Sequence, residues 1–345
     1  MDTDAAAANA IASGLLRASG MGSGPARRTA WALVAAETCG RASHGLLRLP
    51  YYLDRFAAGG TDPRATLDLV RSTTVTAAYD GGNGLGHWQA WDAAVTATEM
   101  AASQGIAAVS IANSGHCGVL GLYVRPMVDA GLVGLVLSTG PAVIPPPGGS
   151  RAVLSTSPIA AGIPMRPRAA VVDVAMSAVA RGRIAEYAAS GGQIPAGWAY
   201  DADGSPTTDA HAALAGLLAP LGGAKGFALA FLVESLTAGM VGPSLAAEIA
   251  DPLAPLSAGD PQRIAHLVIA IDPACLDVDG DSHARLDRLG SSIVSAGGRI
   301  PGADRRAPAE MHDHDRVTIP GPLAATLVAL ARDRGVEVPD GFASG

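Results

Sequence analysis

The sequence predicts an α/β or α+β protein in which a sheet lies beside a helical region formed from both chain ends. Short apolar runs alternate with helical patterns from residue 107 onward, which indicates a sheet covered by helices. Further helical patterns fill residues 5–38 and return at 323–334, so we expect the two chain ends to pack together. The closest match to the dinucleotide fingerprint GxGxxG, residues 82–87, ends in a histidine, so a Rossmann fold is not predicted.

Periodicity, glycine and proline set the expected elements. Gly20 ends the first helix, and Pro25 stands where the first turn of the second helix tolerates proline. Helices are expected at 5–19, 26–38, 46–56, 87–103, 122–130, 176–190, 227–236, 286–296 and 323–334. Strands are expected at 67–79, 107–112, 133–138, 169–175 and 266–271. Loops are expected at 80–86, 113–121, 145–150 and 191–216. We divide the chain into a helical region, 1–75, that packs with 285–345, and an α/β region, 76–284.

The composition excludes several classes of function. The chain has 345 residues and a net charge of −7, whereas nucleic acids require a basic field. It contains no run of about 20 apolar residues free of Gly, Pro and charge, so no membrane span is expected. The first residues do not have the basic and apolar pattern of a secretory signal. Three cysteines without a CxxC pair favour reduced thiols in a soluble, cytoplasmic protein.

Two histidine-containing loops are the strongest candidates for a reaction centre. Ser43 and His44 lie in one glycine-bearing polar loop, and His116 lies in another, NSGHCG (113–118). Such loops present an imidazole at a cleft, where it can give or take a proton near neutral pH. If the segment after His44 is helical, Arg48 lies one turn away and can hold a carboxylate through two hydrogen bonds. The alternative for each histidine alone is a structural cap.

Lys225 is the only lysine among 24 basic residues. Because Arg and Lys are not interchangeable in a tight pocket, a lysine at this one position suggests that a compact ammonium is needed there. Glycines surround it before an expected helix, in PLGGAKG (220–226), a setting that suits an anion such as a pyrophosphate or carboxylate. The alternative is a solvent-facing lysine retained by chance. The charged run at 312–315, HDHD, is interpreted as a solvated loop, so no metal site is predicted.

Eight stretches of the chain form a recognisable set. They are SHGLLRLPYYLDRFAAGG (43–60), DGGNGLGH (80–87), NSGHCG (113–118), GLVGLVLS (131–138), VVDVAMSAVARGRI (171–184), GGQIPAGWAYDADGSPTTD (191–209), PLGGAKGFALAFLVESL (220–236) and IPGADRR (300–306). In this order they resemble the malate/L-lactate dehydrogenase type 2 family, which also includes ureidoglycolate, sulfolactate and diketogulonate dehydrogenases and piperideine-2-carboxylate reductases. The resemblance implies a non-Rossmann α/β fold with a mixed sheet and a nicotinamide cofactor, NAD(H) or NADP(H), bound between domains. It also implies a homodimer with its active site near the interface.

The resemblance also implies roles for single residues. His116 matches the proton donor or acceptor of the family, and Ser43 and His44 match a polar pair beside the reacting centre. Arg48 matches the residue that binds the substrate carboxylate, and Tyr52 and Thr156 are assigned to substrate binding with it. The positions assigned to the cofactor are Gly118, Val119, Leu120, Asp173, Val174, Ala175, Ala224, Lys225, Arg305 and Arg306.

The chain departs from the family pattern around the pocket. Two asparagines that are common in the family are missing from the stretches STG (138–140) and STSP (155–158), and Met176 stands where a hydroxyl is common. The ketimine-reducing branch carries an acid where Arg183 stands, and this arginine is similar to the basic residue of the hydroxyacid dehydrogenases. Arg181, Arg183, Arg305 and Arg306 each suit a 2′-phosphate, so the choice between NAD and NADP stays open.

The residues and the resemblance together predict an oxidoreductase. It would move a hydride between the nicotinamide and the alpha carbon of a small 2-oxo or 2-hydroxy carboxylic acid. The alternative on the same scaffold is an imine (ketimine) reductase that forms a cyclic or N-alkyl amino acid in a specialised biosynthetic pathway. A second alternative, motivated by the missing asparagines, is a catalytically silent protein that keeps the dinucleotide-binding fold.

Overall fold

A seven-stranded mixed sheet forms the centre of the molecule. The computed structural model describes residues 1–250, 257–303 and 312–342. The strand order is β2-β3-β4-β11-β5-β6-β7, with β3 and β4 parallel and the other neighbours antiparallel. The strands are β2 (Asp68–Ser72), β3 (Thr76–Gly84), β4 (Ile106–Ser114), β5 (Val133–Ser138), β6 (Ile159–Ile163), β7 (Ala170–Val174) and β11 (Ile264–Ile271). The prediction of an α/β protein with a mixed sheet is therefore confirmed.

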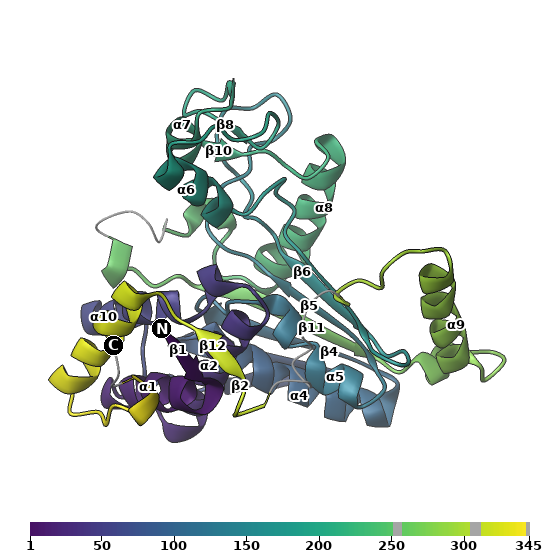
Figure 1. The fold of residues 1–345 in the computed structure, drawn as a ribbon. Coiled ribbons are helices and arrows are strands. Elements are labelled where there is room, and N and C mark those ends of the chain that lie inside the picture. The colour runs from purple at the N-terminus through teal and green to yellow at the C-terminus, as the bar shows by residue number, and fades with distance from the viewer. Residues whose placement is uncertain (251–256, 304–311, 343–345) are drawn as a thin grey trace.

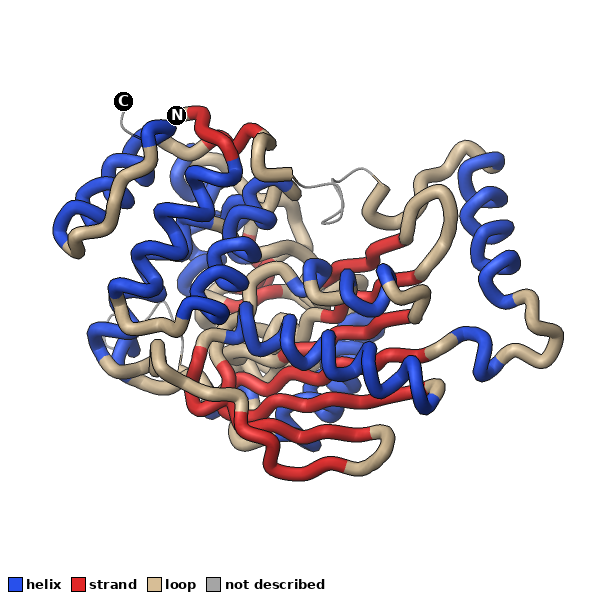
Figure 2. The backbone as a smooth tube through the Cα atoms, turned by 90° about the horizontal axis from the view of Figure 1, so that it is seen from below, coloured by secondary structure: helices blue, strands red, loops and turns tan. Residues whose placement is uncertain are grey.

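Helices cover both faces of this sheet. On one face, α4 (Gly86–Gln104) connects β3 to β4 and packs over the strands beside α5 (Arg125–Asp129) (Figure 2). Buried alanines along α4 let it pack closely on Val136 and Val268. The adjacent residues Leu137 and Leu267 point to the opposite face, where they meet α8 (Ala224–Glu234). Among the described residues, no helix combines the length and apolar character needed to cross a bilayer.

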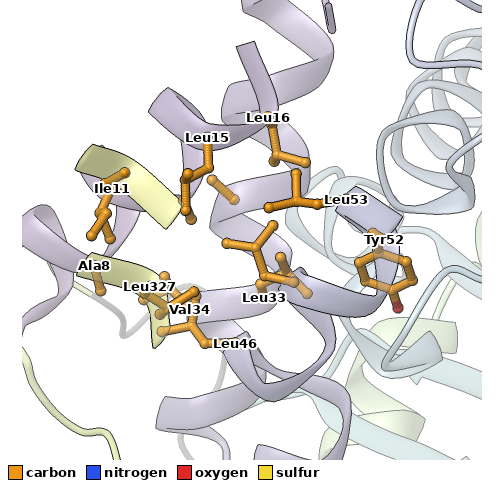
Figure 3. Close-up of a cluster of buried hydrophobic side chains, with 14 of the residues drawn as sticks. Ala8, Ile11, Leu15, Leu16, Leu33, Val34, Leu46, Tyr52, Leu53 and Leu327 are labelled. Atoms are coloured by element: carbon orange, nitrogen blue, oxygen red, sulfur yellow. The ribbon is translucent and has the colours of Figure 1, made fainter. Parts of the chain in front are cut away.

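The two chain ends share one helical cluster. The helices are α1 (Ala5–Ala18), α2 (Ser23–Thr38), α3 (Leu49–Ala58) and α10 (Gly321–Asp333), and the short strands β1 (Asp2–Asp4) and β12 (Arg316–Thr318) pair beside them. Figure 1 shows both termini at this end of the molecule. Side chains from all four helices interlock in its core, including Ile11, Leu33, Leu53 and Leu327 (Figure 3).

The predicted boundaries of the helical region differ from the structure. Strand β2 lies within the predicted range 1–75, yet it belongs to the central sheet. Helix α9 (Ser282–Ser295) lies almost wholly within 285–345, yet it projects from the opposite end of the molecule (Figure 1). Both departures arise because a helical or strand pattern does not show which partner an element packs against.

A third, smaller unit lies at one end of the sheet, at the top of Figure 1. It contains α6 (Arg181–Ser190), α7 (Ala210–Ala215) and a three-stranded sheet of β8 (Ala199–Tyr200), β9 (Pro206–Thr207) and β10 (Leu217–Leu218). Its own core includes Ile184, Ile194 and Leu218. The loop expected at 191–216 is wrong at β8, β9 and α7, because strands of 2 residues and a helix of 6 are too short to have a detectable period.

The expected strand at 67–79 is instead a hairpin of β2 and β3. The Thr73 hydroxyl accepts hydrogen bonds from the N–H groups of Val75 and Thr76, at 3.3 and 3.1 Å, and reverses the chain. The expected loop at 80–86 is also wrong, because β3 continues to Gly84. Its glycines leave room for Gln89, whose amide donates to the Gly81 carbonyl at 2.6 Å.

Candidate active site

The segment that carries Ser43, His44 and Arg48 leaves the end of α2 as two 3-10 turns, Ala42–His44 and Leu46–Arg48. The Glu37 carboxyl fixes the join by accepting a hydrogen bond from the Leu46 N–H at 2.7 Å. A Cβ at position 45 would collide with this carboxyl and displace it, so glycine leaves room for the hydrogen bond. Burial raises the pKa of Glu37 to about 7.

Ser43, His44 and Arg48 form a connected group. The Ser43 hydroxyl lies 3.0 Å from Nδ1 of His44, within hydrogen-bond distance. Arg48 is not one α-helical turn from His44 as expected; its side chain folds back, and Nε donates to the Ser43 carbonyl at 2.9 Å. No described residue hydrogen-bonds the two terminal amino groups of Arg48. That pair of donors has the fork geometry that a carboxylate requires.

His116 follows the end of β4 and lies in the same cluster. Its ring stacks on that of His44, with 5.8 Å between centroids and 27° between planes. The hydroxyl of Tyr52, on α3, lies 2.7 Å from Nδ1 of His116. The backbone N–H of His116 donates to the Gln262 side chain at 3.1 Å. Nε2 of His116 has no hydrogen-bond partner among the described residues and retains contact with solvent. Two loops that are 72 positions apart thus converge.

The electrostatics of this cluster keep both imidazoles neutral at neutral pH. Burial, together with the positive fields of Arg48 and Arg41, lowers the pKa of His44 to about 4. Burial and the neighbouring His44, His87 and Arg48 hold the pKa of His116 well below its usual range. Burial also raises the pKa of Tyr52, so its hydroxyl stays protonated.

Sequence analysis missed His87 as a site residue. Its ring lies 5.2 Å from the Tyr52 ring and 6.0 Å from the His116 ring. The side chain is 1% exposed, and neither ring nitrogen has a hydrogen-bond partner among the described residues. Burial lowers the pKa of His87 to about 3. The sequence feature that could have identified His87 is its position at the end of the glycine-rich stretch DGGNGLGH.

His266 was also missed, because it lies in an apolar strand pattern that gives no sign of a polar role. It is fully buried on β11, and burial lowers its pKa to about 4. Nδ1 lies 2.9 Å from the Ser138 hydroxyl, and Nε2 lies 3.1 Å from the Ser114 hydroxyl. Ser114 in turn donates to Gln89 at 2.6 Å. This network fixes the strand ends directly before the His116 loop.

The serines and threonine at the altered family positions hold a buried carboxylate. Glu234 on α8 is 5% exposed and accepts hydrogen bonds from the Thr139 hydroxyl at 3.0 Å and the Ser155 hydroxyl at 3.3 Å. It also accepts from the Ala246 N–H at 2.7 Å. Burial raises the pKa of Glu234. Thr156, assigned to substrate binding, follows this contact and accepts from the Met176 N–H through its carbonyl at 2.8 Å.

Several positions assigned to the cofactor adjoin one another. The run of Gly118, Val119 and Leu120 follows His116, and Gly118 has a φ of +73°, which glycine adopts without strain. A Cβ at Gly121 would lie 3.2 Å from the Asp173 carboxylate, so bare backbone faces this acid. Asp173 begins the assigned run that continues with Val174 and Ala175. A surface of bare backbone beside a carboxylate suits a flat ring and ribose hydroxyls, so these residues fit a nicotinamide cofactor.

Ala224 and Lys225 lie farther along the chain, in the first turn of α8. Lys225 was expected before the helix; instead it is the second helical residue, and it is exposed. Gly222 and Gly223 precede it with positive φ and open space around them. Arg305 and Arg306 lie outside the described residues. Within 1–250, 257–303 and 312–342, no group of three or more His, Cys, Asp or Glu side chains could hold a metal ion.

Comparison with known proteins supports an enzyme built on this fold. The sequence model of malate/L-lactate dehydrogenase matches residues 3–344. A (2R)-3-sulfolactate dehydrogenase (NADP(+)) of Chromohalobacter salexigens is 36% identical, over 87% of this chain and 89% of that protein. A Delta(1)-pyrroline-2-carboxylate/Delta(1)-piperideine-2-carboxylate reductase of Pseudomonas aeruginosa is 37% identical, over 86% and 90%. The solved sulfolactate dehydrogenase of Methanocaldococcus jannaschii superimposes with a TM-score of 0.88 at 27% identity, covering 98% of both chains. The family that the sequence resembles is therefore confirmed, and this chain belongs to the malate/L-lactate dehydrogenase family.

Proposed function

We propose that this protein is a nicotinamide-dependent oxidoreductase acting at the alpha carbon of a small 2-oxo or 2-hydroxy carboxylic acid. The observation that carries the proposal is a cluster of Arg48, His44 and His116, in which the two amino groups of Arg48 have no hydrogen-bond partner among the described residues. A guanidinium fork selects a carboxylate, and an imidazole beside it can exchange a proton with the neighbouring oxygen. Relatives that act on sulfolactate support the same substrate class.

In this proposal, His116 carries the proton. During oxidation, Nε2 of His116 accepts the proton of the substrate hydroxyl, and during reduction the protonated ring returns it to the carbonyl oxygen. Because Nε2 exchanges the proton, Nδ1 keeps its own hydrogen in both states of the ring, and the Tyr52 hydroxyl can accept a hydrogen bond from it throughout. His44, with Nδ1 held by Ser43, directs its other nitrogen to the reacting oxygen and polarises it.

The carboxylate of the substrate adjusts the acidity of His116. Before substrate binds, burial and Arg48 hold the pKa of His116 low. A bound carboxylate places a negative charge beside Arg48 and offsets part of its field, which raises the pKa of His116 toward neutrality. A general acid–base group is most effective when its pKa is close to the working pH. Arg48 would therefore both hold the substrate and couple its arrival to the protonation of His116.

The cofactor supplies or accepts the hydride. Gly118, Val119 and Leu120 would offer backbone to the nicotinamide half, and Asp173 would accept hydrogen bonds from a ribose hydroxyl. Thr156 would complete the pocket on the substrate side. Lys225 would neutralise an anionic group of cofactor or substrate, since its ammonium is exposed beside the open Gly222–Gly223 turn.

A cyclic imino acid is a second candidate substrate. The 37% identical relative is named for pyrroline-2-carboxylate and piperideine-2-carboxylate reduction. An imine carries the same carboxylate and an equally reducible alpha carbon, with nitrogen in place of oxygen. Arg183, in the first turn of α6, occupies the position where the ketimine-reducing branch has an acid. An arginine there, which pairs with Glu186 at 2.7 Å, cannot hold a cationic iminium as a carboxylate would. We therefore place the keto and hydroxy acids first.

We further propose that the protein forms a homodimer through the outer face of α8. Between its charged ends, Lys225 and Glu234, this helix is apolar on every side, which is typical of a helix buried on every side. Its inner residues pack on the sheet, whereas Leu229, Phe231 and Leu232 are exposed in the single chain. A second copy would cover this surface.

The three cysteines form no disulfide, which supports a reducing, cytoplasmic location.

The test of the proposed function is a turnover assay. The full chain is incubated with NADH or NADPH and a panel of 2-oxo acids and cyclic imino acids, and dinucleotide oxidation is followed by absorbance. We expect turnover of at least one 2-oxo acid, with the hydride delivered to the alpha carbon, as deuterium-labelled cofactor and NMR would establish. Absence of turnover with every substrate and both cofactors would contradict the proposal.

A further inference from the structure

A cavity of about 810 Å³ opens on the side of the molecule away from the helical cluster. It lies between α5, α9 and the turn that joins β6 to β7. Its volume falls within the range of pockets that bind small ligands. His44, Arg48 and His116 do not line it, so it is not the pocket in which the reacting carbon would lie.

This cavity begins next to the residues assigned to the cofactor. Gly121 and Val171 line it, and Gly121 is the residue whose Cβ would meet Asp173. Side chains at alternate positions of a strand share a face, so Asp173 and Val171 lie on one face of the edge strand β7, and Ala169, directly before this strand, also lines the cavity. From Asp173 to Ala169 the extended chain covers roughly 13 Å. A dinucleotide whose nicotinamide lies by His116 would run along this track into the cavity.

The polar lining of the cavity leaves positive charge available. Arg125 pairs with Asp129 at 3.1 Å within α5. Asp287 on α9 accepts a hydrogen bond from the backbone N–H of Arg166 at 2.7 Å. This bond fixes the turn and does not involve the arginine side chain. The Arg166 guanidinium has no partner among the described residues. Arg168 also lines the cavity, and its guanidinium donates to the Ala303 carbonyl at 2.9 Å.

We propose that this cavity is the subsite for the adenosine end of the cofactor, and that Arg166, with Arg168 beside it, binds a 2′-phosphate. The proposal deepens the proposed function by naming NADP(H) as the preferred dinucleotide. A 2′-phosphate carries close to two negative charges and presents three acceptor oxygens, which a guanidinium binds in a forked geometry. Adenosine without this phosphate has no group that requires an unpaired arginine, so NAD(H) would gain nothing from Arg166.

The subsite can be tested without turnover. Adenosine 2′,5′-bisphosphate and 5′-AMP carry only the adenosine end, with and without the 2′-phosphate. Isothermal titration of each into the full chain should give an affinity for the bisphosphate about tenfold to hundredfold higher, since a charge-assisted hydrogen bond is lost with the phosphate. Arg166→Ala should remove most of this difference and leave the affinity for 5′-AMP unchanged. Because Arg166 is exposed, the variant should fold normally.

Arg151→Ala is the matched control, since Arg151 is also exposed and does not line the cavity. Equal affinities for the two nucleotides, or a preference that Arg166→Ala does not change, would overturn the subsite. If such a protein still turned over 2-oxo acids, the proposed function would stand without it. Arg166-dependent binding of the bisphosphate in a protein that lacks all turnover would support the subsite and contradict the proposed function.

Discussion

The Tyr52 hydroxyl and Nδ1 of His116 lie 2.7 Å apart, although 64 positions separate the two residues in the chain. The Tyr52 ring belongs to the helical cluster formed by the chain ends, and its hydroxyl points away from the aliphatic side chains (Figure 3). His116 extends from the end of a central strand. This hydrogen bond therefore connects the helical region to the sheet at the atom that sets the orientation of the proposed acid–base group.

Tyr52→Phe should lower kcat by about tenfold to hundredfold, the range typical when the partner that orients a functional histidine is removed. The phenyl ring keeps the packing but leaves Nδ1 of His116 without its partner. The pH profile of kcat should shift as well, which a purely structural change would not produce. Tyr51→Phe is the matched control, because Tyr51 adjoins Tyr52 but the hydroxyl at Nδ1 of His116 is that of Tyr52. Unchanged kcat in Tyr52→Phe would contradict the role of this bond.

Arg48→Ala should raise KM for the carboxylate substrate by about a hundredfold, in line with the loss of a charge-assisted, two-pronged hydrogen bond. Arg48→Lys should recover only part of this loss, because an ammonium offers a point charge without the fork. Steady-state kinetics on the keto acid and on its uncharged amide separate a loss of carboxylate binding from a general loss of substrate binding. The amide should respond weakly to both changes, and an equal response of acid and amide would contradict carboxylate binding by Arg48.

Glu234→Ala should destabilise the fold by about 2–4 kcal/mol, because the hydroxyls of Thr139 and Ser155 and one backbone N–H lose a buried acceptor. Glu234→Gln keeps an acceptor oxygen and should cost roughly half as much. Urea unfolding measures both values. Glu99→Ala on the exposed face of α4 serves as control and should change stability little. A small effect of Glu234→Ala would show that these contacts contribute nothing to stability.

Stability should fall as the solution is acidified below pH 6.5. His44 and His266 have a pKa of about 4 in the fold against 6.5 when exposed, and His87 has a pKa of about 3. The unfolded chain therefore binds more protons between these values, so stability is complete above pH 6.5 and is lost toward pH 4. For buried His266 alone the loss is roughly 3 kcal/mol. Glu37, whose pKa is about 7, opposes the trend between pH 4.5 and 7.

Urea unfolding from pH 4.5 to pH 8 checks this expectation. His266→Gln should show a shallower dependence on pH than the wild-type protein, because the variant lacks one group that resists protonation. A pH dependence that is identical in the two proteins would contradict the assignment of His266 as a buried neutral histidine.

Phe231→Glu should convert a dimer into a monomer. Phe231 is 60% exposed on the outer face of α8. A carboxylate there should leave the fold of one chain intact and disrupt only its contact with a second copy. Sedimentation or light scattering should give half the wild-type mass. Val278→Glu is the control, because Val278 is 99% exposed but lies close to α9 rather than on α8. A wild-type monomer, or a dimer that survives the Phe231 change, would contradict an interface on α8.

Local patterns predicted the long elements well. Strand β5 occupies Val133–Ser138, the expected range, because its run of Val and Leu has no competing interpretation. Strand β6 was not predicted, since its sequence IAAGI contains small residues without clear alternation. The hairpin of β2 and β3 was missed because its turn depends on the Thr73 side chain rather than on glycine or proline.

The site was predictable only in part. The sequence indicated His44, Arg48 and His116, because each lies in a polar, glycine-bearing context or beside one. It could not indicate that Tyr52 reaches His116, since that contact depends on how α3 packs against the sheet. His266 was hidden for a related reason: a histidine among apolar strand residues becomes recognisable only when Ser114 and Ser138 are seen on each side of its ring.

The most direct test of the central claim is the single-turnover rate of hydride transfer in His116→Gln, with His44→Gln beside it. Dinucleotide affinity, measured by fluorescence, should stay unchanged in both. We expect the transfer rate of His116→Gln to fall by about a thousandfold, within the range for loss of a general acid–base group, and that of His44→Gln to fall less. A wild-type rate in His116→Gln, with the loss confined to His44→Gln, would contradict the assignment of the proton to His116.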